Sequence, residues 1–142
     1  MKYIAHRGNT EGITEFENKI EYLKHAYSLG YGLEVDVRCH KDKLYFGHDE
    51  PQEEIDNELL ILPDVFVHLK DFKSVELLAH RKDLNMFWHN NDEMVFTTQG
   101  NIWCYPGNNI IHPKSIWLCL NDTTIPTDIP DIYGICIDKM KT

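Results

Sequence analysis

The sequence has no long apolar run and no excess of positive charge. No stretch of the 142 residues approaches the length that crosses a membrane, and residues 1–6 lack the extended apolar core of a signal peptide. The formal net charge is −9. Because non-specific nucleic-acid binding depends on a basic surface, we expect no nucleic-acid partner. From the missing apolar runs we expect a cytoplasmic protein without a membrane span. An anionic substrate is still compatible, since a bound cation can invert the local field.

Closely spaced cysteine pairs are also missing. The four cysteines, at 39, 104, 119 and 136, form no CxxC pair, which argues against a zinc ribbon. Most of them lie in apolar, strand-like runs, so we predict reduced and largely buried thiols. No internal repeat or low-complexity tract is present. The length predicts a single domain, 1–142, that is large enough to bury a core.

The clearest chemistry lies in residues 32–49. Between 33 and 37, apolar residues alternate with Glu34 and Asp36, which is the period-two pattern of a strand. That alternation places both carboxylates on one face, roughly 6–7 Å apart along the strand. Two neighbouring acids repel each other unless a cation or a proton lies between them, and a hard divalent ion is a natural occupant. A second extended run, 43–47, ends at His48.

The remaining chain alternates apolar runs with turn residues. Helical spacing after Phe16 predicts a first helix, with Asn18 and Glu21 as a capping box and Gly30 as its C-terminal stop. Residues 50–58 are rich in acids and predict a loop or a short helix, and a second helix is predicted over 74–84. Counted without 43–47, the predicted strands number eight: 3–5, 33–37, 65–70, 86–89, 94–98, 102–105, 115–120 and 133–137.

Four short motifs occur in one order: His6-Arg7-Gly8, Glu17-Asn18, Leu-Glu-Val-Asp-Val at 33–37, and His48-Asp49. Together they resemble the signature of the glycerophosphodiester phosphodiesterase family, whose TIM-barrel fold is related to phosphatidylinositol phospholipase C. The match covers about residues 1–70. The chain is shorter than the roughly 250 residues usual for that fold. The resemblance therefore implies a reduced TIM-type (β/α)8 barrel, α/β in class, with several outer helices missing.

The resemblance also implies roles for individual residues. Glu34 and Asp36 would hold one divalent metal ion, with Mg, Ca or Mn as candidates, and His6 and His48 would act as the acid and base pair. The substrate phosphate would contact Arg7 and Lys70.

One position departs from the family pattern. Where the third strand of the family usually carries E-x-K, this chain has His68-Leu69-Lys70. A neutral imidazole can ligate a divalent metal, but it removes a negative charge and suits Mn or Zn better than Ca or Mg. His68 is thus a candidate third metal ligand, with a proton-transfer role or a loss of activity as the alternatives.

In this fold the active site lies at the carboxyl ends of the strands, so polar residues that end apolar runs should converge. Besides the residues above, His89, Tyr105 and Asp138 are candidates for the pocket, with Asp138 either orienting a histidine or accepting a substrate hydroxyl. His25, His80 and His112 are predicted at the surface.

The function implied is a metal-dependent phosphodiesterase that hydrolyses a small glycerophosphodiester-like substrate through His/His acid–base catalysis. Two alternatives stay open: a non-catalytic module that binds a phosphorylated ligand on the same barrel, and a phospholipase D-like lyase. Because missing helices would expose the outer faces of strands, Ile102, Trp103 and Trp117 suggest a homodimer.

Overall fold

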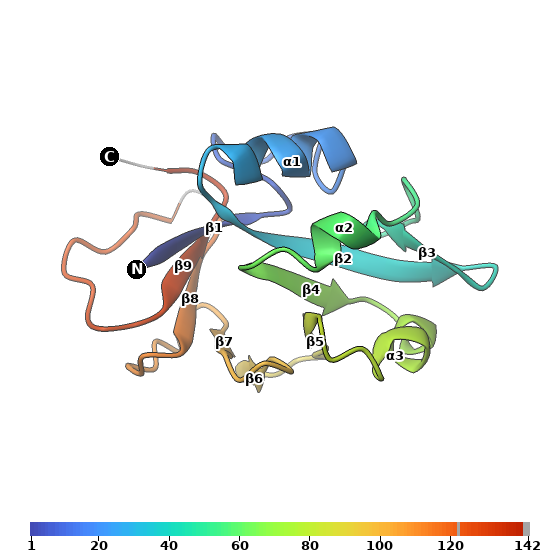
Figure 1. The fold of residues 1–142 in the computed structure, drawn as a ribbon. Helices are drawn as coiled ribbons and strands as arrows, with labels where there is room; N and C mark the ends of the chain where they lie inside the picture. The colour runs from blue at the N-terminus through green and yellow to red at the C-terminus, as the bar shows by residue number, and fades with distance from the viewer. Residues whose placement is uncertain (122, 141–142) are drawn as a thin grey trace.

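The chain is arranged around one mixed sheet in the computed structural model, which describes residues 1–121 and 123–140 (Figure 1). The strands are β1 (Lys2–His6), β2 (Gly32–His40), β3 (Lys43–Phe46), β4 (Val65–Leu69), β5 (Asn85–Phe87), β6 (Met94–Phe96), β7 (Ile102–Cys104), β8 (Ser115–Cys119) and β9 (Gly134–Ile137). Their order in the sheet is β5-β4-β2-β1-β9-β8-β7-β6, with β3 paired to β2. All pairs are parallel except β2–β3 and β6–β7, which are antiparallel.

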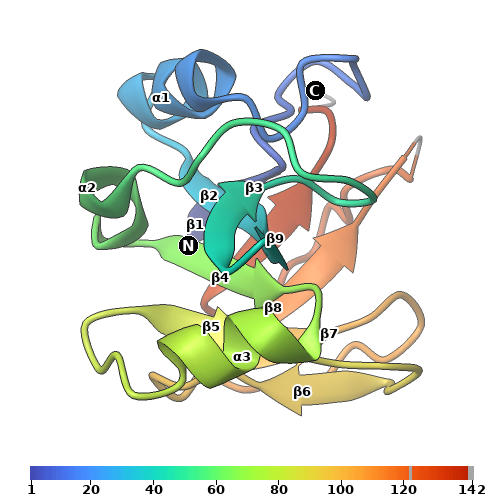
Figure 2. The same ribbon diagram turned by 90° about the vertical axis from the view of Figure 1, so that its right-hand side faces the viewer.

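The sheet curls into a nearly closed barrel (Figure 2). Its two end strands approach each other, because the Thr98 N–H just after β6 donates to the Met86 carbonyl of β5 (2.8 Å). The Met86 N–H in turn donates to the Thr98 hydroxyl (2.9 Å). These contacts satisfy backbone groups that an open edge would expose. The structure therefore supports a mixed α/β, barrel-shaped fold.

In the described residues, the helices all lie before residue 79. They are α1 (Ile20–Ser28), α2 (Asn57–Leu60) and α3 (Phe72–Leu78). Helix α1 packs on β2, α2 on β4, and α3 on both strands (Figure 1). Helix α3 begins before the predicted residue 74, because Asp71 caps its first turn, and it ends at Leu78, before the predicted residue 84.

Three groups of buried side chains fill the structure. One lies inside the barrel, where Phe66, Phe87 and Trp103 pack together. A second lies between the sheet and the helices and includes Leu23, Val35 and Val67. The third covers the outer face of β7–β9 with loop residues such as Ile125 and Ile132 in place of helices.

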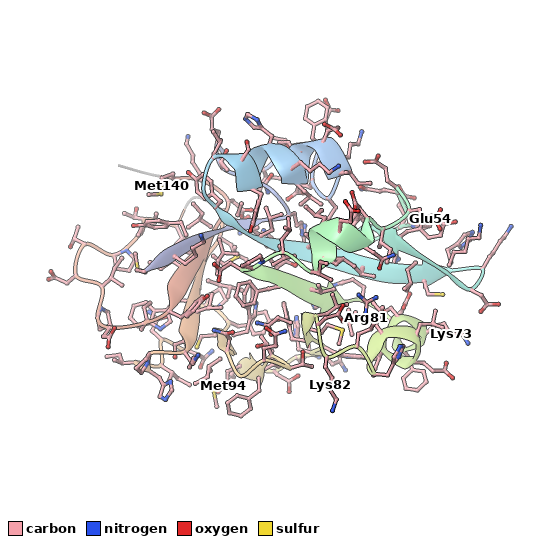
Figure 3. All side chains as sticks on the ribbon, in the orientation of Figure 1. Glu54, Lys73, Arg81, Lys82, Met94 and Met140 are labelled. Carbon is pink, nitrogen blue, oxygen red and sulfur yellow. The ribbon has the colours of Figure 1, made fainter. Side chains whose placement is uncertain are left out.

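This third group overturns one expectation. Trp103 and Trp117 are only 2% and 6% exposed, so the predicted bare outer face at these tryptophans is wrong. Trp103 points into the barrel, and the Trp117 indole N–H donates to the Ile110 carbonyl of a covering loop (2.8 Å). The exposed apolar side chains lie elsewhere, for example Phe96 and Met94 on β6 (Met94 is labelled in Figure 3). The homodimer itself stays a prediction.

The predicted capping box of α1 is also wrong. The residue before the helix is Lys19, which makes no side-chain cap, and Asn18 turns away to bind Asp36. Instead the Ile20 N–H donates to the Glu53 carboxylate from the segment that follows β3 (2.9 Å). Gly30, with a φ of +97°, follows the last turn and confirms the predicted stop.

Two further expectations concern thiols and membranes. All four cysteines are free, and Cys104, Cys119 and Cys136 are buried, as predicted. Within residues 1–121 and 123–140, none of the helices combines the length and apolar character that a membrane span needs.

Asp71 links β2 to α3, which makes it a test of the fold. Its carboxylate accepts from the Ser74 N–H in the first turn of α3 (2.9 Å) and from the Cys39 N–H of β2 (3.0 Å). We expect Asp71→Ala to lower the free energy of unfolding by about 1–2 kcal/mol, because both donors lose their acceptor. Asp71→Asn, which keeps an acceptor oxygen, should lose less than half as much. Urea unfolding measures the free energy of unfolding of both variants, and we expect the m-value to stay unchanged. Equal stability of Asp71→Ala and wild type would contradict this role.

Candidate functional site

Strand register brings the polar candidates to one end of the barrel. In the parallel pairs, His6 lies opposite Glu34, and Asp36 lies opposite His68. Since parallel strands present their carboxyl ends at the same edge, residues far apart in sequence meet there. A pocket of about 250 Å³ opens at this edge and is lined by His6, Arg7, Glu34, His48, His68, Lys70, His89, Trp103, Tyr105, Leu118 and Leu120.

Two buried carboxylates lie at this end of the barrel, and Glu34 is the one that lines the pocket. Glu34 is 2% exposed and Asp36 is fully buried. Among the described residues, neither oxygen of Glu34 has a hydrogen-bond partner, and Oδ1 of Asp36 also has none. Burying such oxygens is unfavourable unless a proton or a cation compensates them. The two carboxylates are therefore a candidate cation site.

His68 lies beside the two carboxylates. Its Nδ1 lies 3.3 Å from Asp36 Oδ1 and 3.7 Å from Glu34 Oε1. One ligand atom from each of the three residues lies within 4.8 Å of the others. Two carboxylates and an imidazole are a donor set that divalent metals accept, so the residues fit the predicted metal ion.

The charges in the site shift the pKa values of its members in opposite directions. Burial alone would lower the pKa of His68, but interactions with the carboxylates of Asp36 and Glu34 outweigh it and raise this pKa. Burial would raise the pKa of Asp36, but His68, Arg7 and Asn18 together hold it well below its usual range. Asp36 is therefore a carboxylate at neutral pH, ready to ligate a cation.

The side chains of Arg7 and Asn18 hold Asp36 in place. The Asn18 side-chain amide donates to Asp36 Oδ2 (2.9 Å) and accepts from the Asp36 N–H (3.0 Å). Arg7 Nε lies 3.0 Å from the same Oδ2. Both Arg7 and Asn18 adopt the left-handed conformation, with φ of 55° and 65°. Non-glycine residues adopt it only when surrounding contacts hold them, and here those contacts aim both side chains at Asp36.

His6 is held by Asp138 beneath the pocket. Its Nδ1 lies 2.7 Å from Asp138 Oδ1, and its Nε2 lies 3.5 Å from Glu34 Oε2. The buried Asp138 also accepts from the Asn9 amide (2.9 Å) and the Asn121 N–H (2.7 Å). Burial would lower the pKa of His6, but Glu34 and Asp138 raise it. Because Asp138 binds Nδ1, Nε2 is the His6 nitrogen that lies beside Glu34.

His48 reaches the pocket from the turn after β3. The Gly47 N–H donates to the Asp36 carbonyl (3.0 Å), and the Arg38 guanidinium donates to the His48 carbonyl. Gly47 is required here, since a Cβ at this position would lie 1.9 Å from the Glu50 carbonyl oxygen. His48 Nδ1 lies 2.9 Å from the carboxylate of the exposed Asp49. Each of the two predicted acid–base histidines thus has its Nδ1 against an aspartate.

Aromatic rings form the opposite wall of the pocket. The His68 ring is stacked between Phe87 (centroids 4.6 Å apart) and His89 (4.9 Å). The His89 ring in turn lies 4.2 Å from that of Tyr105. Burial and the positive charges of His68 and Lys70 lower the pKa of His89 to about 4. Burial, together with the charges of Glu34 and Asp36, raises the pKa of Tyr105.

The structure brings most of the predicted residues together. Eight of them line one pocket: His6, Arg7, Glu34, His48, His68, Lys70, His89 and Tyr105. Asp36 and Asp138 lie outside that lining; both are buried (0% and 1% exposed), and Asp138 supports His6 instead of forming the pocket wall. His25, His80 and His112 are exposed, as predicted.

Sequence reasoning missed the supporting residues Asn9, Asn18 and Arg38. The first two are fully or almost fully buried, at 0% and 1% exposure. Asn18 belongs to the Glu17-Asn18 motif, but the sequence pattern predicts a capping box for it, because that is the commoner use of asparagine before a helix. Its partner in the structure is Asp36. Nothing in the sequence points to Arg38, whose role depends on a backbone carbonyl ten positions away.

Metal binding by this cluster has a clear test. We expect wild type to bind Mn²⁺ in calorimetry, and Glu34→Gln, Asp36→Asn and His68→Ala each to weaken binding at least tenfold. The raised pKa of His68 means that a proton competes with the metal for this side chain. The Mn²⁺ affinity should therefore begin to fall at a pH above 6.5, the ordinary histidine value, and should keep falling at lower pH. Glu21→Gln, on the exposed face of α1, is the matched control. Equal Mn²⁺ affinity in wild type and Glu34→Gln would remove the metal site.

Comparisons with known proteins place no relative beside this chain. No family description matched it, and searches of curated proteins and of solved structures found no match. What supports a function is therefore the arrangement of the chain's own side chains.

Proposed function

We propose that this chain is a metal-dependent phosphodiesterase that acts on a glycerophosphodiester-like substrate. The observation that carries the proposal is the convergence of four kinds of group on one pocket: two histidines, two cationic side chains, a buried carboxylate pair and an imidazole next to that pair. Phosphodiester cleavage needs proton carriers, compensation of phosphate charge and, in many enzymes, a divalent ion. Each need has a candidate here.

The proposal includes a reduced TIM-type barrel as the scaffold. With the antiparallel β3 set aside, successive strands are neighbours in the sheet from β1 through β2 and β4 to β5, and again from β7 through β8 to β9, which returns to β1. This order supports the assignment. The antiparallel β6 and the small number of helices in the described residues are where the chain departs from a full (β/α)8 barrel.

The cationic groups would bind the substrate phosphate. Lys70 lies at the pocket just after β4, and Arg7 lies there just after β1. Their positive charges would oppose the negative charge that develops on the phosphoryl oxygens. A divalent ion held by Glu34, Asp36 and His68 would supply further compensation as a Lewis acid.

The two histidines would divide the proton transfers. One accepts the proton of the attacking hydroxyl or water as the new P–O bond forms, and the other donates a proton to the leaving alcohol as its P–O bond breaks. His6 Nδ1 is bonded to Asp138 and His48 Nδ1 to Asp49, so Nε2 is the nitrogen of each ring left to exchange a proton.

Phosphorus NMR tests this function directly. We expect wild type to cleave glycerophosphodiesters with Mn²⁺, and His6→Ala and His48→Ala each to lose about 10²–10⁴-fold in rate, because each removes one proton carrier. His25→Ala, on the exposed end of α1, should keep the wild-type rate. Circular dichroism checks that all variants are folded.

The outcomes separate the alternatives. A cyclic phosphodiester product would identify a lyase-like reaction, because a substrate hydroxyl then replaces water as nucleophile. No turnover with Mg²⁺, Mn²⁺, Ca²⁺ or Zn²⁺, together with retained phosphate binding, would overturn the enzyme in favour of a binding module. Wild-type rates in both histidine variants would overturn the acid–base assignment.

A further inference from the structure

The aromatic wall of the pocket carries two polar atoms that the reaction described above does not use. Nδ1 of His89 and the hydroxyl of Tyr105 are buried, and neither has a hydrogen-bond partner among the described residues. Both residues line the pocket that holds His6 and His48. Buried polar atoms are unfavourable without a partner, so two of them on residues that line one pocket indicate a ligand group that would satisfy them.

The two residues are placed by separate strands and are fixed against each other. Tyr105 follows β7, and His89 follows β5 by two residues. Their rings are 4.2 Å apart, and the stack continues through His68 to Phe87. Such packing holds the rings without using their polar atoms. Among the described residues, this packing leaves the hydroxyl and the imidazole nitrogen without a partner.

The surroundings decide what kind of group this pair would bind. Trp103, Leu118 and Leu120 form the nearby lining and carry no charge. Arg7 and Lys70, the cationic groups suited to phosphate, line the same pocket, so a phosphate bound there would lie near this pair. A phenol hydroxyl can donate and accept, and an imidazole nitrogen pairs with a hydroxyl in either tautomer. An alcohol hydroxyl matches both, whereas an alkyl chain would leave both unpaired.

We propose that His89 and Tyr105 form a hydroxyl-recognition subsite, which selects a compact phosphate ester whose alcohol carries further hydroxyls near the phosphorus. The proposal rests on the proposed function, because it takes the phosphate to lie at Arg7 and Lys70. A pocket of about 250 Å³ suits a small polyol ester better than one with a long acyl chain. His89 and Tyr105 are thus specificity-determining residues.

Binding of two small probes tests the subsite without requiring turnover. Glycerol 3-phosphate carries two hydroxyls, and n-propyl phosphate has the same carbon chain with none. Calorimetry with Mn²⁺ present should show that wild type binds glycerol 3-phosphate at least tenfold more tightly, because the second probe leaves both protein groups unpaired. Tyr105→Phe and His89→Phe keep the aromatic stack, and each should reduce this preference to about threefold or less.

Tyr45→Phe removes a hydroxyl from β3, outside the residues that line the pocket, and should keep the wild-type preference. Equal affinity of wild type for the two probes, binding of neither, or an undiminished preference in both pocket variants would overturn the subsite. Selective binding of glycerol 3-phosphate without cleavage of any phosphodiester would overturn the proposed enzyme while leaving the subsite in place. The two failures are therefore distinguishable.

Discussion

The buried carboxylate pair of Glu34 and Asp36 is the constraint on which the site depends. Two acids on one strand face would repel each other at neutral pH, and burial makes each charge more unfavourable. Three surrounding groups lie against these carboxyl groups. The amide of Asn18 and the guanidinium of Arg7 contact Asp36, and the imidazole of His68 lies between the two acids. Much of the polar architecture at this end of the barrel is arranged around these two buried carboxyl groups.

Parallel strands explain why the positive and proton-carrying groups arrive at the same place. The carboxyl ends of β1, β4 and β9 deliver His6, His68 and Asp138 to one edge, and the turn after β3 adds His48. Outside the barrel, helices cover β2 and β4, whereas loop residues such as Ile125 and Ile132 cover β8 and β9. In the described residues, the apolar outer face of the sheet is thus covered by few helices and by loops. The polar side chains lie at the end of the barrel that holds the pocket.

Short-range patterns in the sequence were reliable where the structure is local. The alternation around Glu34 and Asp36 predicted a strand with both acids on one face, and the eight predicted strands correspond to β1, β2 and β4–β9, with the 43–47 run as β3. Predictions failed where a side chain had two uses. Asn18 could cap a helix or bind a distant aspartate. It binds the buried Asp36, because an unpaired buried charge destabilises the fold more than an uncapped helix end does.

The sequence by itself determined the strands, the residue types at their ends and the unusual histidine at position 68, since these follow from periodicity and from individual letters. Only the tertiary structure decided which ends meet. It placed Asp138 against His6 across 132 positions, and it packed the tilted rings of His89 and Tyr105 against each other while leaving the His89 Nδ1 and the Tyr105 hydroxyl without a partner among the described residues. It also buried Trp117 under a loop that no local pattern predicts. Strand register and loop packing are long-range properties, and they are fixed by the burial of the whole core and not by neighbouring residues.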